Sequence, residues 1–239
     1  MGALTSPLPR AALIHIRDAW GARTAQADNC IKAFRAVYSG LDSTPTAGIK
    51  SVHASRGGAT AWSIAEVRQF MAQHPSGTAA RMWMMLAMFS TARISDLTKL
   101  GRGHEIQRDG ITWLEWQPGK KGSAFVSLPL APQLIEEARA QIVIGSAYIL
   151  NAHGKPFRSS GALGIRVQRW TDTAGLSQRS SHGLRKAGAV LLAESGATQH
   201  QIMAVMAHTS PQTSEIYTRS AARARLAAEA MRSISGFRL

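Results

Sequence analysis

The chain has 239 residues, 45% of them hydrophobic, which is enough for one or two domains with ordinary cores. Its 28 Lys and Arg against 14 Asp and Glu give a net charge of +14, which favours a nucleic acid partner over a basic protein that binds none. The single cysteine, Cys30, excludes an intrachain disulfide and a cysteine-based zinc site, and it fits a reducing compartment. The longest apolar run, residues 82–89, is far below the roughly 20 residues that span a bilayer, so we expect no membrane partner.

The first 60 residues predict two helices and a linker. Apolar residues at helical spacing predict helices over 10–20 and 24–38. Residues 39–60 are rich in Gly, Ser, Thr and Pro, which is typical of a linker that either follows a DNA backbone or is simply solvated. We therefore expect a domain boundary near residue 60, between residues 1–60 and 61–239.

The second domain begins with a helix start that the sequence marks clearly. Ser63 and Glu66 form a capping box, in which each side chain satisfies a free backbone N–H. The next predicted helix, over 77–90, is apolar on all sides and is therefore expected at the centre of the core. Arg93 follows it directly, and either pairs with Asp96 or binds a DNA phosphate.

Residues 104–130 change to a β-type pattern. The runs 111–116 and 124–128 are typical of strands, and residues 118–123 join them in a turn that carries Lys120 and Lys121. By themselves these lysines indicate only a soluble turn. With helices on both sides of this region, the fold class is mainly α with a small antiparallel β-sheet or hairpin (α+β).

Two further helices are predicted before the last quarter of the chain. Residues 132–144 have an apolar face that includes Ile142 and Val143, and residues 160–173 form a helix with several arginines nearby. The short segment 148–150 between them is apolar.

Phosphate-binding residue types recur at fixed intervals in the last quarter. Ser181 is a plausible cap for a helix on which His182 and Arg185 lie one turn apart on the same face. His208 follows Arg185 by 23 residues, after a helix capped by residues 198–201, and Tyr217 follows His208 by nine. Residues 210–211 open another turn, and an Ala- and Arg-rich helix is predicted over 219–234.

Each of these residues has an ordinary structural interpretation when it is taken singly. These interpretations are a half-buried Tyr217, a helix-capping His182, a surface His208, and an Arg185 paired with Glu194 or Glu215. Their joint occurrence at these intervals in a basic chain favours a catalytic site over four unrelated residues.

The segments His182-Gly-Leu-Arg185, Met206-Ala-His208 and Ile216-Tyr217-Thr218 together resemble the signature of the tyrosine recombinase (phage integrase) family. Arg93 in Ala-Arg-Ile-Ser-Asp-Leu resembles its first arginine box, and Lys121, eight residues before Pro129, resembles its hairpin lysine, with Lys120 as the alternative. The chain departs from the family pattern at Ala207 and Thr91, where the family usually has Gly.

The resemblance implies the tyrosine recombinase catalytic fold for residues 61–239, with a C-terminal helix, and a partial helical DNA-clamping region in residues 1–60. It implies that Tyr217 forms a 3′-phosphotyrosine with DNA while Arg93 and Arg185 bind the phosphate. Lys121 would protonate the leaving 5′-oxygen, His182 would assist proton transfer, and His208 would hydrogen-bond the phosphate. No metal, ATP or other cofactor is implied.

The predicted function is therefore site-specific DNA recombination or integration. The expected partners are double-stranded DNA, further copies of the chain in a tetramer on paired sites, and accessory DNA-bending proteins. The expected location is the cytoplasm, at the nucleoid, in a bacterium or a mobile element. The alternatives are a type IB-like topoisomerase, a non-catalytic DNA-binding regulator derived from an integrase and, last, a basic RNA-binding protein.

Overall fold

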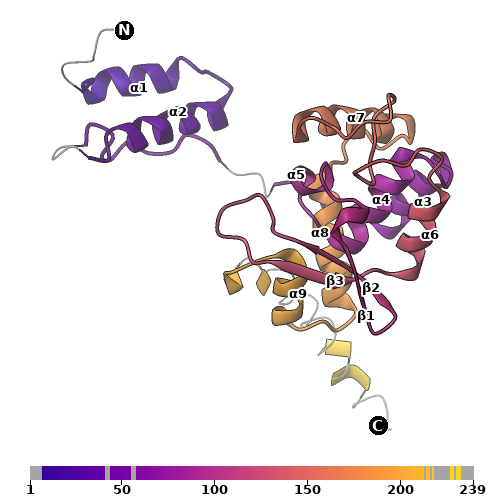
Figure 1. The fold of residues 1–239 in the computed structure, drawn as a ribbon. Helices are drawn as coiled ribbons and strands as arrows, with labels where there is room; N and C mark the ends of the chain where they lie inside the picture. The colour runs from indigo at the N-terminus through magenta and orange to yellow at the C-terminus, as the bar shows by residue number, and fades with distance from the viewer. Residues whose placement is uncertain are drawn as a thin grey trace. The chain divides into compact units, whose positions relative to one another are not determined.

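The computed structural model describes residues 7–40, 44–54, 58–212, 214, 215, 217, 227, 228 and 230–232. The chain divides into two compact units, residues 1–58 and 59–239 (Figure 1). Each unit is described by itself below.

The N-terminal unit is built on two helices, α1 (Arg10–Asp18) and α2 (Thr24–Val37). Leu13 from α1 and Ile31 from α2 are buried together with Tyr38 and Ile49. The core of this unit is therefore small and depends on one residue, Ile49, from the segment that the sequence assigns to a linker.

Residues 44–54 pack along these helices, which differs from the linker predicted over residues 39–60. Three arginines of the helices donate to backbone carbonyls of this segment: Arg10 to Gly48 at 3.1 Å, Arg17 to Lys50 at 3.1 Å and Arg35 to Ile49 at 2.7 Å. Asp28 accepts the backbone N–H groups of Val52 and His53, and these bonds with that from Ser51 lower its pKa to about 2. The composition of the segment gave no sign of these side-chain contacts.

The C-terminal unit is mainly helical with one small sheet. Its elements in chain order are α3 (Ile64–Gln73), α4 (Ala79–Ser90), α5 (Ile94–Leu97), the 3-10 helix η1 (Arg102–His104), β1 (Glu105–Arg108), β2 (Ile111–Trp116), β3 (Val126–Pro129), α6 (Pro132–Ala140), α7 (Ser160–Thr173), α8 (Ser181–Glu194) and α9 (Gln199–Met206). The predicted fold class is confirmed.

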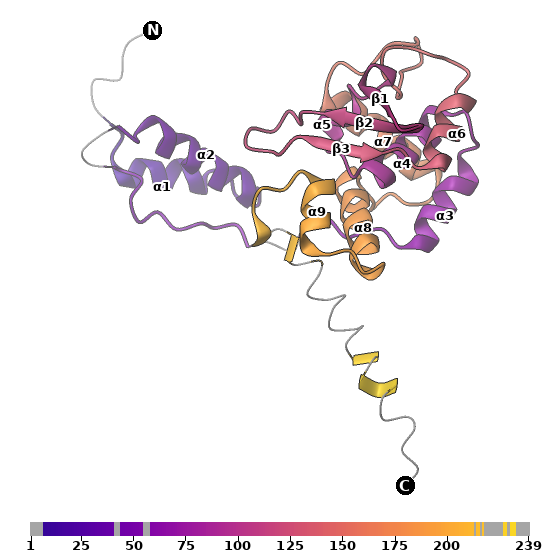
Figure 2. The ribbon, with the colours of Figure 1, turned by 60° about the horizontal axis from the view of Figure 1, so that its bottom comes forward.

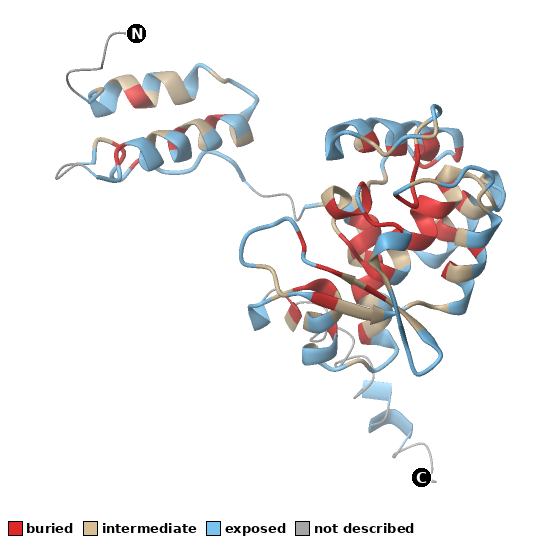
Figure 3. Cartoon of the chain, viewed as in Figure 1, coloured by how far each residue is buried: buried red, intermediate tan, exposed pale blue. Residues whose placement is uncertain are grey.

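Helix α4 forms the centre of the core, as its apolar sequence predicts. Most of its residues are buried, and in Figure 3 it lies among the other buried segments of the unit. It packs against α3, α6 and α8. Because α4 leads directly into Arg93, the best-packed helix of the molecule positions the first predicted site residue.

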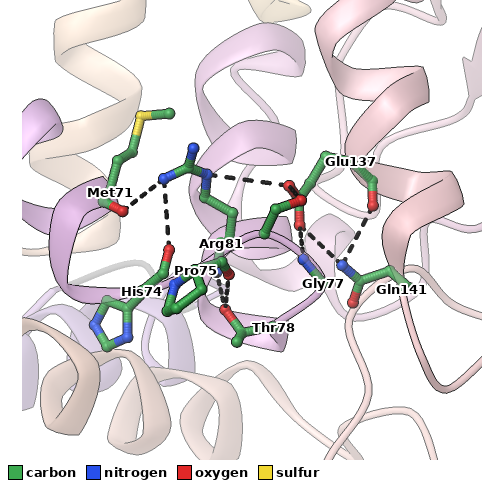
Figure 4. Close-up of polar contacts among 9 residues, drawn as sticks. Met71, His74, Pro75, Gly77, Thr78, Arg81, Glu137 and Gln141 are labelled. Carbon is green, nitrogen blue, oxygen red and sulfur yellow. Dashed lines mark hydrogen bonds and ion pairs between the residues drawn. The ribbon is translucent and has the colours of Figure 1, made fainter.

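The start of α4 is fixed by a buried carboxylate from α6. Glu137, 5% exposed, accepts from Ser76 Oγ at 2.7 Å, from Gly77 N at 2.9 Å and from Gln141 Nε2 at 3.0 Å (Figure 4). Arg81 lies 4.0 Å from the same carboxylate and donates to the Met71 carbonyl. A buried charge is stabilised when hydrogen bonds and a cation surround it, so this network holds the turn between α3 and α4 against α6.

The sheet has the order β1-β2-β3, with both pairs antiparallel. Asp109 and Gly110, both with positive φ, form the two-residue turn between β1 and β2. Leu114 and Val126 are buried, and α9 packs beside β3 (Figure 2). The turn between β2 and β3 therefore lies on the same side of the C-terminal unit as α9.

Two local predictions, the end of α6 and the cap of α8, change. α6 ends at Ala140 rather than at 144, so Ile142, which we expected on its buried face, is 90% exposed. The α8 cap is Ser180 rather than Ser181, since Ser180 Oγ accepts Gly183 N at 3.2 Å. The helix predicted over 219–234 lies outside the described residues, except for 227, 228 and 230–232, which are helical.

Among the described helices, none has both the length and the apolar character needed to cross a bilayer.

Candidate active site

Arg185 lies at the centre of the predicted site residues. It is on the first turns of α8 and only 7% exposed. Its Nη1 donates to the Thr91 carbonyl, and its Nη2 donates to the Met206 carbonyl at 2.6 Å and faces His208 Nε2 at 3.3 Å. One guanidinium thus connects α8 with the ends of α4 and α9.

Both carbonyls belong to turns that hold a non-glycine residue in the left-handed region. Thr91, at the end of α4, has φ of 47°, and Ala207, at the end of α9, has φ of 52°. This conformation costs about 1–2 kcal/mol for an L-residue, so glycine would be the less strained residue at both positions. The Thr91 hydroxyl donates to the Val205 carbonyl at 3.3 Å, a bond that glycine could not make.

The close approach of α8 to the α4 turn depends on Gly188. A Cβ at this position would lie 2.8 Å from Thr91 Cγ2 and 3.3 Å from the Met88 carbonyl oxygen. Because real Cβ atoms do not approach so closely, glycine allows Arg185 to reach the Thr91 carbonyl.

The charge of Arg185 is strongly desolvated. Burial, together with the nearby charge of Arg93, lowers its pKa to about 10, against the opposing effects of Tyr217 and Asp96. At neutral pH the group is still a cation. Among the described residues its hydrogen-bond partners are neutral, so the site has an excess of positive charge that an anion would relieve.

His208 is held in one tautomer. Because Arg185 can only donate, Nε2 of His208 accepts, and Nδ1 carries the proton that it donates to Ser214 Oγ at 2.9 Å. Burial lowers the pKa of His208 to about 4, and the charges of Arg185, Arg93 and Lys120 contribute. The side chain is therefore neutral at pH 7. The sequence gave no signal for Ser214, which is fully buried.

His182 shares this electropositive environment. It lies in the first turn of α8, exposed, one turn before Arg185. Burial lowers its pKa, and the charges of Lys186, Arg185 and Arg93 lower it further. A neutral imidazole at this place can accept a proton.

Arg93 and Asp96 have different partners, not each other as the ion-pair interpretation supposed. Arg93 Nη1 donates to Ser123 Oγ at 3.1 Å, and Asp96 Oδ1 accepts Gly119 N at 3.0 Å. Asp96 is buried. Both bonds lead to the turn between β2 and β3, so the start of α5 holds the lysine-bearing turn.

The two lysines of this turn are exposed. The charge of Lys120 contributes to the low pKa of His208, which places Lys120 within the electrostatic reach of the site. Our first choice for the hairpin acid is Lys121, and the assignment between the two lysines stays a prediction.

Tyr217 lies against a small apolar cluster made by α8 and α9, which contains Ala189, Ala193, Ile202 and Met206. Burial raises the pKa of its phenol, and the charge of Arg185 lowers it. Arg93, His182, Arg185, His208 and Tyr217 therefore share one electrostatic environment, although they come from distant parts of the sequence.

Comparisons with known proteins concern the family and the fold of the chain. The phage integrase family profile matches residues 61–223. A lambda integrase dimer bound to a COC′ core site is similar with a TM-score of 0.72 at 19% identity, over 91% of this chain and 82% of that one. XerH recombinase in a post-cleavage complex with a palindromic difH substrate gives 0.67 at 20% identity, over 92% and 72%. A lambda integrase tetramer bound to a Holliday junction gives 0.68 at 18% identity, over 85% of this chain and 65% of that one. No curated protein sequence matches this chain significantly.

Proposed function

Because this chain belongs to the phage integrase family, we propose that it is a site-specific DNA recombinase that cleaves and rejoins double-stranded DNA through a 3′-phosphotyrosine intermediate. The observation that carries the proposal is the buried guanidinium of Arg185. It is a desolvated cation with neutral hydrogen-bond partners, beside Arg93 and within electrostatic reach of a tyrosine. A phosphodiester is the anion that makes use of both the charge and the tyrosine.

In the proposed cleavage step, the Tyr217 oxygen attacks phosphorus and forms an O–P bond, while the bond from phosphorus to the 5′-oxygen breaks. Arg93 and Arg185 bind the non-bridging oxygens, whose charge grows in the transition state. His208 donates a hydrogen bond to the same phosphate, which requires the tautomer with the proton on Nε2. The phosphotyrosine keeps the energy of the broken bond for religation.

Two proton transfers accompany this step. The phenol proton of Tyr217 passes to His182, whose lowered pKa keeps it neutral and able to accept. The leaving 5′-oxygen takes a proton from the hairpin lysine, which is Lys121 in our assignment and Lys120 in the alternative. Religation reverses both transfers.

The proposed partners are double-stranded DNA and further copies of this chain. The solved lambda integrase tetramer on a Holliday junction supports a homotetramer on paired sites. We assign residues 1–60 to a partial DNA-clamping region, which the compact two-helix unit supports. Accessory DNA-bending proteins complete the proposed assembly.

Covalent trapping tests the proposal. The protein is incubated with nicked genomic fragments in chelator and denatured, and the DNA that stays attached is sequenced, beside Tyr217→Phe. We expect adducts at one recurring sequence with the wild-type protein and none with the variant. Adducts from Tyr217→Phe at the wild-type level would refute the assignment of the nucleophile.

Two other results would favour the alternative functions. Adducts spread over all sequences would indicate a type IB-like topoisomerase. Sequence-specific DNA binding without any adduct would indicate a non-catalytic regulator.

A further inference from the structure

We propose that Thr209 is a positioning residue that fixes the lysine-bearing turn between β2 and β3 (residues 117–125) for proton transfer to the leaving 5′-oxygen. The inference rests on the proposed function and adds a residue to it. Thr209 Oγ1 donates to the Gly122 carbonyl at 3.1 Å, across 87 residues of sequence. Thr209 directly follows His208, so this bond joins the turn to the segment that carries His208.

Among the described residues, the other side-chain hydrogen bonds that reach the turn from outside it come from one side. Asp96 accepts Gly119 N, and Arg93 donates to Ser123 Oγ, so both of these contacts come from the start of α5. The Thr209 bond is the contact from the opposite side, the end of α9. With the Thr209 bond, the turn is attached both to the start of α5, which carries Arg93, and to the segment after α9, which carries His208.

Packing does little to fix the tip of this turn, residues 119–122, which is exposed. Lys120, Lys121 and Gly122 are exposed, and a Cβ built at Gly122 would meet no atom within 4 Å. Gly122 also has φ of 76°, a conformation that glycine adopts and leaves freely. Beyond the buried Pro118, hydrogen bonds therefore hold the part of the turn that carries the lysines, since an exposed segment opens at low free-energy cost.

The position of the turn affects only one part of the cleavage step. When the tyrosine oxygen bonds to phosphorus, the electron pair of the breaking bond goes to the 5′-oxygen, which then takes a proton from the lysine ammonium. A displaced turn slows this transfer but leaves the arginines and Tyr217 in place. A leaving group that needs no proton removes the requirement, and a thiolate is such a group because a thiol has a pKa of about 8.5.

The experiment compares Thr209→Val, which keeps the shape and removes the hydroxyl, with Thr209→Ser, which keeps the hydroxyl. Single-turnover adduct formation is measured on one cleavage site with either a normal phosphodiester or a 5′-bridging phosphorothiolate. We expect Thr209→Val to cleave the normal substrate about 5- to 10-fold more slowly, the loss expected for one hydrogen bond, and the phosphorothiolate at the wild-type rate. Thr209→Ser should cleave both substrates at the wild-type rate.

Two results would overturn the inference. One is wild-type cleavage of the normal substrate by Thr209→Val. The other is an equal defect of Thr209→Val on both substrates with an unchanged melting temperature, which would place Thr209 in phosphate binding. Failure of the wild-type protein to form an adduct with either substrate would instead refute the proposed function.

Discussion

Arg185 on α8 donates from Nη2 to the carbonyl oxygen of Met206 at the end of α9, at 2.6 Å. The same guanidinium donates to the Thr91 carbonyl at the end of α4. Arg185 therefore holds three helix ends together in addition to any part it takes in chemistry, and its substitution should affect folding as well as activity.

Arg185→Met should lower the free energy of unfolding by about 2–5 kcal/mol, because it leaves two buried carbonyls without donors. Arg93→Met is the matched control, since Arg93 donates to a side-chain hydroxyl in the turn, and its loss should cost less than about 1 kcal/mol. Both variants should lower adduct formation at least about 100-fold. Urea denaturation and covalent trapping measure the two effects, and equal losses of stability would contradict the structural role of Arg185.

The free energy of unfolding should decrease as the pH is lowered through the range where His208 is neutral in the folded chain but protonated in the unfolded chain. Its pKa is about 4 when folded and 6.5 in the reference state, so the unfolded chain binds the extra proton between these values. The contribution is complete above pH 6.5 and is lost as the pH falls toward 4. Thermal unfolding at pH 7 and pH 5 should show a smaller decrease for His208→Asn, which keeps an acceptor and a donor; an unchanged decrease would show that other groups cause it.

Gly188→Ala should destabilise the protein by about 1–3 kcal/mol, because the added Cβ overlaps Thr91 Cγ2. Thr91→Gly removes that side chain and fits the left-handed turn, so the double variant should regain part of the loss. Gly164→Ala on α7 is the control, since its Cβ would meet only Ile94 Cδ1 at 3.7 Å, and it should gain up to about 1 kcal/mol. A double variant whose unfolding free energy is the sum of the single effects would argue against the overlap.

Asp96→Ala should loosen the lysine-bearing turn by removing the acceptor of Gly119 N, whereas Asp96→Asn keeps an acceptor oxygen. Hydrogen exchange at the Gly119 amide should therefore accelerate about tenfold in Asp96→Ala and change little in Asp96→Asn. NMR measures this exchange directly. Equal exchange in Asp96→Ala and the wild-type protein would show that the turn is held by other contacts.

The sequence predicted best those features that depend on neighbours along the chain. The capping boxes at Ser63 and Thr198 are confirmed, because cap and partner lie three residues apart. The one-turn spacing of His182 and Arg185 on α8 is confirmed for the same reason. Strand β1 was not predicted as a separate strand, although Asp109-Gly110 is the usual two-residue hairpin signal and could have located it.

The partners of the site residues could not be predicted in the same way. Arg185 bonds to backbone carbonyls, and every residue has a carbonyl, so no side-chain pattern identifies Thr91 and Met206 as partners. Asp96 likewise accepts a backbone N–H rather than pairing with the nearby Arg93. The end of α6 was misplaced because helical periodicity continued through Ile142, where the chain had already left the core.

The desolvated cation at Arg185 also makes the choice of buffer matter. A ligand that binds only the folded state raises stability by RT ln(1 + [L]/Kd), and sulfate or inorganic phosphate has the negative charge that the carbonyl partners of this guanidinium lack. Melting temperatures taken in phosphate should therefore exceed those taken in chloride at equal ionic strength. Chloride solutions, in which no anion occupies the site, would then give the lowest melting temperature, and that value belongs to the unliganded protein.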